Sequence, residues 1–420
     1  MSSCPHKALA DYNFFDPAVI EDPFDFYRAA REEAPVYRLP DTDIYFVSRY
    51  EDVRQALKRT EDFSNDFLDQ LNVPLKSKEA EAIYAQGWAV ADTLLTVDPP
   101  RHKVYRKLLN KVFSQRRVDG MEDYMVQIVN ELIDGWIDRG EVDLLNEFCV
   151  PFPIWVIADQ LGVPRKDMEF FKQASDCFAS RLSGFADEAK EVEDAKAIVA
   201  FQHYFVDKVE ALRRNPQDNI ISDLALARID DGRLLNTEEL LSIIQQLLVA
   251  GNETSRATIA GGVLKLIQNP EQYARLQADH SLIPNAVEEI LRLETPSCGL
   301  WRLVKRDSEL GGVAIPAGSM LMVRFASANR DEAVFEHPES MDICRRNADD
   351  HLAFGQGVHF CLGAQLARKE LNVAFAALLS RTGNWRLTEG RNSLKHWPNM
   401  ILRGLEQLHI QFDKAERQAA

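Results

Sequence analysis

Hydrophobic residues recur at helical spacing over most of the first 293 residues, and this pattern predicts a mainly helical chain. The clearest segments are bounded by proline, glycine or acidic residues, which begin and end helices. The longest, over 237–268, is apolar on nearly all sides at its centre, which predicts a helix buried inside a large protein. The predicted helices cover residues 101–112, 121–139, 188–214 and 237–268, and a further helix follows residue 363 to about residue 380.

Short apolar and alternating runs predict a minor β part near the start and in the last third of the chain. Asp41-Thr42-Asp43 separates the first two runs, which predicts a hairpin. Because no repeat or glycine-rich linker divides the sequence, we expect one domain over residues 1–420, with an extended arm over about residues 1–20. The predicted strands cover residues 36–39, 44–47, 300–304, 309–315, 320–325, 385–387 and 408–412.

The chain is acidic: 49 Lys and Arg residues stand against 65 Asp and Glu residues, a net charge of −16 over 420 residues. Nucleic-acid phosphates and anionic membranes repel such a chain, so we expect neither as a partner. The six cysteines are scattered without the spacing of metal ligands, which is typical of a reducing compartment. No apolar leader opens the sequence, and we therefore expect a soluble cytoplasmic protein.

The most informative segment is the glycine-rich stretch over residues 354–364. Cys361 precedes a predicted helix, whose positive N-terminal end favours the thiolate. Gly357 permits a turn with positive φ, and Gly363 leaves space for a flat ligand against the backbone. A thiolate with one open face suits the axial position of a metal. The alternative is a buried core cysteine, which needs no flanking glycines.

Phe354, Gly357, Cys361 and Gly363, at this spacing, resemble the haem-binding signature of the cytochrome P450 monooxygenases. The resemblance implies the cytochrome P450 fold, with haem b (iron protoporphyrin IX) between the long central helix and the helix after the cysteine. It makes Cys361 the thiolate ligand of the iron, and such a ligand favours O–O bond cleavage. His359 matches a position that contacts a haem propionate in many bacterial members.

Two further motifs resemble the family outside the cysteine loop. Glu289 and Arg292 share a helix face and match its E-x-x-R pair, with Arg345 as the downstream arginine of the same network behind the haem. Such a pair alone is weak support, because surface pairs with this spacing are common. The residues that resemble propionate ligands are His102 and Arg106, one helical turn apart, and Arg302 on the strand after E-x-x-R; a solvated His/Arg pair is the alternative.

The centre of the long predicted helix carries Gly251, Glu253 and Thr254. Glycine costs roughly 1 kcal/mol inside a helix, and a buried glutamate needs a partner, so this composition is unusual. The alternative is a surface turn in which the Thr254 hydroxyl bonds to the carbonyl four residues earlier. The segment resembles the oxygen-binding motif of the family, where Gly251 makes room for O₂, Thr254 hydrogen-bonds to the bound oxygen and Glu253 relays protons. Well-known bacterial members have Asp at the position of Glu253.

The resemblance also indicates which segments surround the substrate. Their residues are mainly apolar, as in most ligand pockets, and we expect hydroxylation or O-dealkylation of a small or medium apolar molecule such as a terpenoid, steroid or aromatic compound. Ser297, Cys298 and Asn399 are candidate polar anchors. The candidate pocket residues are Phe67, Leu71, Val73, Trp88, Val90, Leu182, Leu247, Ala250, Ser297, Leu300, Met400 and Ile401.

Residues 101–117 contain basic residues and no acidic residue, an exception in this acidic chain. In the family this helix lies near the surface where the electron donor docks. We expect an acidic ferredoxin, of the 2Fe-2S type, to bind at Arg101–Arg117, with Arg368 and Lys369 adding charge. A solvated helix face is the alternative. We expect no fused reductase, so electrons from NAD(P)H would pass through a separate ferredoxin reductase.

Two other functions compete with the monooxygenase hypothesis. A peroxide-driven haem-thiolate peroxygenase has an arginine in place of the acid–alcohol pair, and a haem sensor or carrier needs no proton relay. Glu253 and Thr254 argue against both. A zinc protein fails because His359 and Cys361 have no further ligands at suitable spacing.

Overall fold

The computed structural model describes residues 7–67, 74–183, 186–229 and 231–415, without the side chains of Val112, Leu182 and Ser183. The chain forms two compact units. The first comprises Met1–Phe67, Ala257–Cys361 and Trp385–Leu408, and the second comprises Leu68–Arg256, Leu362–Asn384 and His409–Ala420. The single-domain interpretation stays a prediction.

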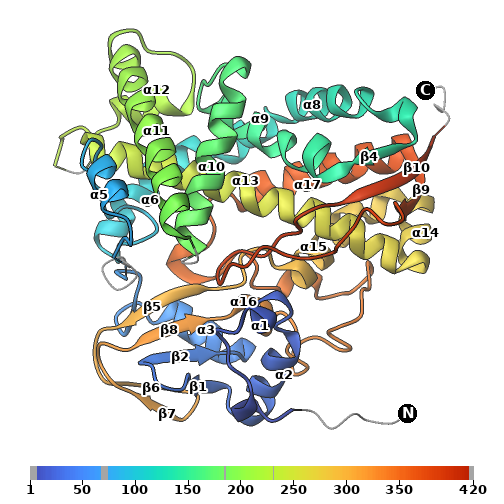
Figure 1. Ribbon diagram of the computed structural model, residues 1–420, viewed down its shortest axis with the longest axis horizontal. Coiled ribbons are helices and arrows are strands. Elements are labelled where there is room, and N and C mark those ends of the chain that lie inside the picture. Colours follow the sequence, from blue (N-terminus) through green and yellow to red (C-terminus); the bar gives the residue numbers. More distant parts are fainter. Residues whose placement is uncertain (1–6, 68–73, 184–185, 230, 416–420) are drawn as a thin grey trace. The chain divides into compact units, whose positions relative to one another are not determined.

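The first unit is built on a five-stranded sheet with the order β1-β2-β8-β5-β3 (Figure 1). The predicted hairpin is confirmed: β1 and β2 are antiparallel, Val36 lies opposite Val47, and Asp41 turns the chain with a φ of 57°. β2 pairs with β8 in parallel, whereas the other pairs are antiparallel. The strands are β1 Val36–Arg38, β2 Ile44–Val47, β3 Phe63–Ser64, β5 Leu300–Val304 and β8 Met320–Val323.

A separate two-stranded hairpin replaces the single strand predicted over 309–315. It consists of β6 Ser308–Leu310 and β7 Val313–Ile315. Gly311 and Gly312 have φ values of 57° and 80°, a backbone region that favours glycine, and they reverse the chain between the strands. The strand predicted over 320–325 is also shorter, because Phe325 already begins a helix.

The helices of the first unit pack on this sheet and extend the core. Val53 and Leu57 of α3 are buried in the same cluster as Leu321 and Val323 of β8. The arm predicted as extended contains the 3-10 helix Leu9–Asp11 and helix α1, which the Asp16 side chain caps by accepting from the Ala18 N–H at 2.9 Å. The helices are α1 Pro17–Glu21, α2 Phe24–Glu33, α3 Tyr50–Lys58, α14 Pro270–Ala278, α15 Ile283–Glu294 and α16 Phe325–Ala328.

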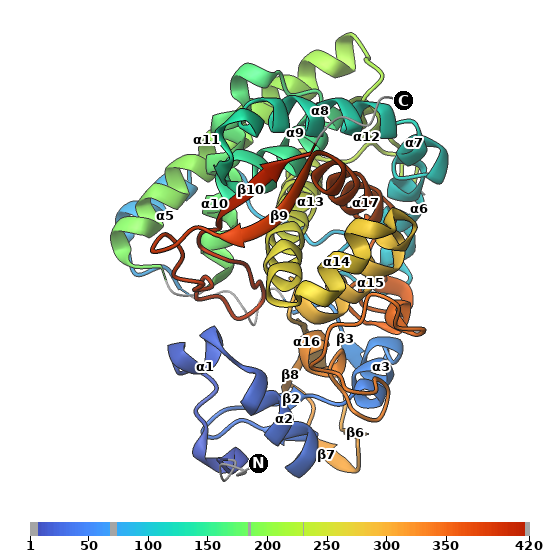
Figure 2. The same cartoon turned by 90° about the vertical axis from the view of Figure 1, so that its right-hand side faces the viewer.

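The second unit is mainly helical, with the small sheet β4-β10-β9 beside the helices (Figure 2). Its helices confirm the ranges predicted over 101–112 and 188–214, and α17 begins one residue after Gly363. The helices are α5 Lys78–Tyr84, α6 Arg101–Val112, α7 Gln115–Asp119, α8 Glu122–Asp134, α9 Pro151–Gln160, α10 Met168–Ser183, α11 Glu188–Arg214, α12 Ile220–Leu226 and α17 Ala364–Arg381. The strands are β4 Glu141–Asp143, β10 His409–Lys414 and β9 Thr382–Leu387, and the last three residues of β9 belong to the first unit.

The helix predicted over 121–139 ends early, at Asp134. Trp136 leaves the helical conformation, with a φ of −135°, and its buried ring packs edge-on against Phe412 at a centroid distance of 5.1 Å. A 3-10 turn over Ile137–Arg139 follows, and Gly140 ends it with a φ of 70°. The tertiary contact of the tryptophan thus overrides the local helical pattern.

Helix α13 spans Thr237–Gln268, as predicted, and the chain passes from the second unit into the first between Arg256 and Ala257. Ile244, Leu248 and Val263 are fully buried, in agreement with the apolar pattern. Within the described residues, no helix has the length and hydropathy needed to cross a membrane.

Candidate active site

The cysteine loop is held by its own backbone. The Cys361 N–H donates to the carbonyl of Phe354 at 2.9 Å, and the rings of Phe354 and Phe360 pack edge to face with centroids 6.3 Å apart. Gly357 has a φ of 78°, and a Cβ there would lie 2.8 Å from the carbonyl oxygen of Leu57, so only glycine fits. These contacts fix the conformation of the loop that carries the half-buried Cys361.

Gly363, two residues after the cysteine, has an open face. A Cβ added there would meet no heavy atom within 4 Å. Cys361 itself is half-buried, and α17 begins at Ala364, so its N-terminal turn follows the thiol closely. A half-buried thiol at Cys361 and an open backbone face at Gly363, two residues later in the chain, each fit a flat ligand with a metal centre, such as haem.

Two buried basic positions suit the anionic edge of such a ligand. Arg302 on β5 is 1% exposed, and one of its nitrogens donates to the carbonyl of Trp301 at 2.7 Å. His102 on α6 is 2% exposed; burial lowers its pKa, the neighbouring Arg106 lowers it further, and Asp98 opposes both. Arg302 belongs to the first unit and His102 to the second, so their grouping around one ligand stays a prediction.

His359 lies in the 3-10 turn Gly357–His359 of the cysteine loop, and its side chain is half-buried. Arg106, one turn after His102, is also half-buried. Both are basic, and neither is a fully solvated surface residue. Their predicted contact with a ligand is therefore compatible with their burial, and it stays a prediction.

The structure brings Glu289, Arg292 and Arg345 together as one buried network. The Arg292 guanidinium donates twice to the Glu289 carboxylate, at 2.8 and 2.9 Å, and Arg345 Nε donates to both of its oxygens at 3.1 and 3.0 Å. Arg292 also donates to the backbone carbonyls of Asn329 and Pro338. Glu289 and Arg292 are 0% exposed and Arg345 is 8% exposed, so every charge in this network is both buried and paired.

One side of α13 is accessible at the centre of this otherwise buried helix. Ala250 is exposed, and Leu247, Gly251 and Thr254 are half-buried. Their spacing places these residues on one helix face. The Thr254 hydroxyl donates to the Ala250 carbonyl at 2.7 Å, which is the back-bonded conformation considered as the alternative, and a Cβ at Gly251 would touch Ile157 at 3.5 Å. The predicted oxygen-binding motif therefore has one face that is accessible to solvent.

The Glu253 side chain is buried, unlike the accessible face of α13, and it belongs to a polar network between α13 and α10. Its carboxylate accepts from Ser175 at 3.2 Å and from Asn252 at 3.1 Å, and it pairs with Arg256 at 2.5 Å. Arg256 also pairs with Asp176 at 3.3 Å, a side chain that is 36% exposed. Burial raises the pKa of Glu253 to about 7, with Arg256 acting against the rise and Asp176 adding to it.

Glu370 on α17 is a further buried acid, and it was not predicted from the sequence. Burial raises its pKa to about 8, and its carboxylate accepts from the Ser255 hydroxyl at 2.6 Å, which opposes the rise. Glu370 lies four residues from both Leu366 and Ala374, so it shares a helix face with these two buried apolar residues. This spacing could have predicted that Glu370 is buried. Ser175 and Arg256 were missed as well, because their role depends on the packing of α10 on α13 rather than on a motif.

The candidate pocket residues differ widely in exposure. Leu247, Leu300, Met400 and Ile401 are half-buried, whereas Val90 is 59% exposed. Trp88 is fixed to α11, because Gln202 hydrogen-bonds to its backbone N–H and carbonyl and the His203 ring meets its indole edge-on. Ser297 is half-buried and forms an isolated bridge with Leu402, while Phe67, Cys298 and Asn399 are buried. Leu71, Val73 and the side chain of Leu182 lie outside the described residues.

Part of the predicted docking charge is neutralised within the chain, which corrects that prediction. Lys369 pairs with Glu122 at 2.6 Å and Asp119 at 3.6 Å, and Arg117 pairs with Asp223 at 2.7 Å. Lys103, Lys107, Lys111 and Arg116 are exposed. The sequence count missed these pairs because the acidic residues come from α7, α8 and α12.

The comparisons with known proteins show which family the chain belongs to. The sequence model of the family described as cytochrome P450 matches residues 162–383. Cytochrome P450 107B1 of Saccharopolyspora erythraea is 36% identical over 408 residues, covering 96% of this chain and 98% of the relative. The chain belongs to the cytochrome P450 family.

Other members of the cytochrome P450 family resemble it over the same length. The steroid C26-monooxygenase of Mycobacterium tuberculosis is 34% identical over 415 residues, covering 98% of each chain. The solved structure of the cytochrome P450 CYP109Q5 from Chondromyces apiculatus matches with a TM-score of 0.83 at 35% identity, covering 97% of this chain and 99% of that one. The fold and enzyme class predicted from the sequence, a cytochrome P450 monooxygenase, are thereby confirmed.

Proposed function

We propose that this cytochrome P450 uses a haem held by Cys361 to insert one atom of O₂ into a C–H bond of a small or medium apolar substrate. The observation that carries the proposal is the cysteine loop, where a half-buried thiol stands beside the open face of Gly363. When bound, the haem supplies the O–O cleavage and C–H oxidation chemistry. His102, Arg106, Arg302 and His359 would hold its propionates.

Glu253 is the proton donor that the network supports best. A carboxyl group whose pKa lies at about 7 both gives and takes protons near neutral pH, which general acid–base catalysis requires. The half-exposed Lys172 pairs with Asp176 at 2.8 Å, and Asp176 pairs with Arg256. This chain of contacts connects the buried carboxyl of Glu253 with solvent. Thr254, on the accessible face of α13, would orient the oxygen and its water.

The substrate class follows from the accessible face and its surroundings. Leu247 and Ala250 present apolar atoms beside Thr254, and the candidate pocket residues are mainly apolar, as expected for a terpenoid, steroid or aromatic substrate. The steroid name of a relative with 34% identity favours testing steroids first. A panel of such molecules, each scored by the spin-state shift of the haem, tests this part of the proposal; no shift with any apolar compound would contradict it.

Electrons would come from NAD(P)H through a ferredoxin reductase and a 2Fe-2S ferredoxin in the cytoplasm. The exposed Lys103, Lys107 and Lys111 of α6 are the residues proposed to dock the ferredoxin. We expect Lys107→Glu with Lys111→Glu to raise the KM for an acidic ferredoxin several-fold, because complementary charge mainly steers association. The exposed Lys166→Glu is the matched control, and equal KM values for both variants would contradict the docking site.

The first test of the whole proposal is the Soret band of the reduced protein with CO. A strongly red-shifted thiolate-type band is expected for the native chain, and its loss is expected in Cys361→His. No haem in the purified native protein would overturn the proposal. Thr254→Ala then separates turnover from binding: NADH and O₂ consumption should continue while peroxide replaces product. A sensor or carrier predicts no change, and a peroxygenase predicts full turnover on peroxide alone.

A further inference from the structure

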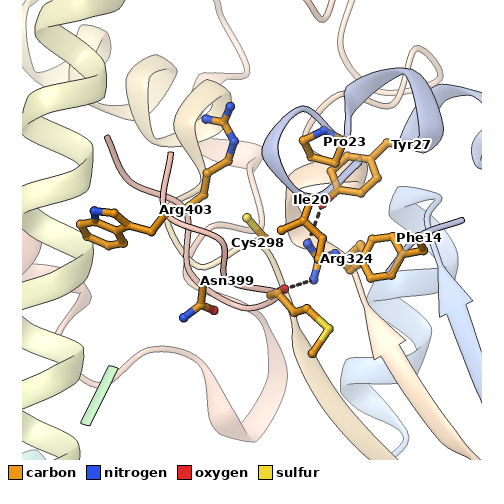
Figure 3. A pocket seen from close by; sticks show the side chains of 10 residues that line it. Phe14, Ile20, Pro23, Tyr27, Cys298, Arg324, Asn399 and Arg403 are labelled. Carbon is orange, nitrogen blue, oxygen red and sulfur yellow. Dashed lines mark hydrogen bonds between the residues drawn. The ribbon is translucent and has the colours of Figure 1, made fainter. Parts of the chain in front are cut away.

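A small cavity in the first unit is lined by hydrogen-bond donors (Figure 3). Its volume is about 10 Å³, which accommodates roughly one water-sized particle. The polar side chains that line it belong to Tyr27, Cys298, Arg324, Asn399 and Arg403, and none of the described lining residues is acidic. The cavity therefore concentrates positive charge without a carboxylate.

Arg324 is a buried charge in need of a counter-charge. It is 3% exposed, its Nη1 donates to the Met400 carbonyl at 2.6 Å, and its Nη2 donates to the Tyr27 hydroxyl at 2.5 Å (Figure 3). Its Nε is buried without a hydrogen-bond partner, and within the described residues no acidic side chain pairs with it. Burying a guanidinium in this way is unfavourable unless a counter-charge accompanies it.

Two of the other lining groups also present donors. Because the Tyr27 oxygen accepts from Arg324, its own hydroxyl proton is directed elsewhere. Asn399 Oδ1 accepts from the N–H groups of Ile401 and Leu402 at 2.8 and 2.9 Å, and its side chain points away from Arg324 (Figure 3). Burial raises the pKa of the Cys298 thiol, so the thiol keeps its proton and carries a donor group.

Among the residues that the structure describes, no acidic side chain forms an ion pair with the second guanidinium, that of Arg403. Its Nη1 lies 2.6 Å from Nε2 of His396. Burial, reinforced by Arg403, lowers the pKa of His396 to about 4, so the ring is neutral and accepts from Arg403. Glu21 accepts from the backbone N–H of His396 at 2.8 Å and lies 3.3 Å from its Nδ1, so this acid serves the histidine.

We propose that this cavity binds one halide-sized monovalent anion, with Arg324 as its main partner and Tyr27 and Cys298 as further donors. The anion neutralises the buried guanidinium. The segments around Cys298 and Met400 are already joined, because the Cys298 N–H donates to the Ile401 carbonyl at 2.7 Å and Arg324 donates to the Met400 carbonyl. An anion bound to Arg324 and Cys298 would stabilise this connection further. The proposal is independent of the substrate and of the haem chemistry.

The test compares sodium bromide with sodium gluconate at equal ionic strength, because gluconate is too large for the cavity. In the full-length protein, saturating bromide should raise Tm by about 1–3 °C more than gluconate does. Crystals in bromide, measured at its absorption edge, should show an anomalous peak within hydrogen-bond distance of Arg324. Equal Tm values in both salts together with no peak in the cavity would overturn the proposal, and the cavity would then hold water only.

Two variants assign the effect to this cavity. Arg324→Gln removes the charge and should abolish the bromide-specific Tm rise, whereas the exposed Arg346→Gln, a matched loss of one arginine in the same unit, should keep it. If Arg324→Gln does not fold, Tyr27→Phe removes a single donor and should raise the apparent bromide Kd about threefold to tenfold. A bromide response unchanged in every cavity variant would contradict the site.

Discussion

Two buried glutamate–arginine pairs with the same i, i+3 spacing have opposite chemistry in this protein. Glu289 receives two bonds from Arg292 and two more from Arg345, and both arginines find backbone carbonyls for their other nitrogens. Glu253 receives one guanidinium contact, from an Arg256 that it shares with Asp176. The spacing is a property of the helix, whereas the number of donors around each carboxylate comes from the neighbouring segments.

The difference separates a structural pair from a titratable one. Four charge-assisted bonds from two guanidinium groups surround the Glu289 carboxylate and balance its charge. One contact does not balance the loss of water around Glu253, and burial therefore raises its pKa to about 7. A buried acid that is incompletely paired is the kind of group that catalysis uses, and its position next to Thr254 agrees with this role.

The largest expected effect is on stability, in the Glu289 network. Arg292→Ala should lower the free energy of unfolding by about 3–5 kcal/mol, because it leaves a buried carboxylate undercompensated and two carbonyls without donors. Arg256→Ala should cost only about 1–2 kcal/mol at pH 7, because Glu253 can take up a proton instead. Urea unfolding of both variants measures the difference. Equal losses would break the comparison.

The next effect is on turnover. Glu253→Gln removes the titratable proton and should lower ferredoxin-supported turnover by about 100-fold, the usual size of a general acid–base contribution. Steady-state NADH consumption and product formation at pH 6, 7 and 8 measure it. The residual rate should lose the native dependence on a group titrating near pH 7. Glu169→Gln on α10, an exposed position, is the matched control, and a rate equal to that control would exclude Glu253 as the proton donor.

A smaller effect on stability is expected at Glu370, another buried glutamate. The pKa of Glu370 is raised to about 8 in the folded protein, so its proton stabilises the fold below the ordinary glutamate pKa, and this stabilisation is lost as the pH rises through about 8. Glu370→Gln keeps an acceptor for Ser255 and is neutral at every pH. At pH 8 the variant should be more stable than the native protein by on the order of 1–3 kcal/mol. Identical pH profiles of urea unfolding would show that Glu370 does not titrate in this range.

Much of the local structure could be predicted from the sequence. The bounds of α11 and α13 were predictable because Asn215-Pro216 and Asn269-Pro270 interrupt the helical pattern and cannot continue it. The hairpin of β1 and β2 was predictable because the turn residues at 41–43 stand between two apolar runs. The spacing of Phe354, Gly357, Cys361 and Gly363 indicated the family without any structural information, because each residue meets a separate local requirement.

What the sequence determined by itself was therefore the set of local elements, the family and the residue types of the site. The tertiary structure decided how each charge is used. Arg345 reaches Glu289 across 56 positions, and Ser255 reaches Glu370 across 115. Trp136 ends α8 because it packs on Phe412. In the described part of the chain no acid pairs with Arg324, and the segment 396–403 supplies the Met400 carbonyl instead. A local pattern fixes conformation through neighbours within a few residues, whereas a pKa or an ion pair depends on which distant groups share the same buried space.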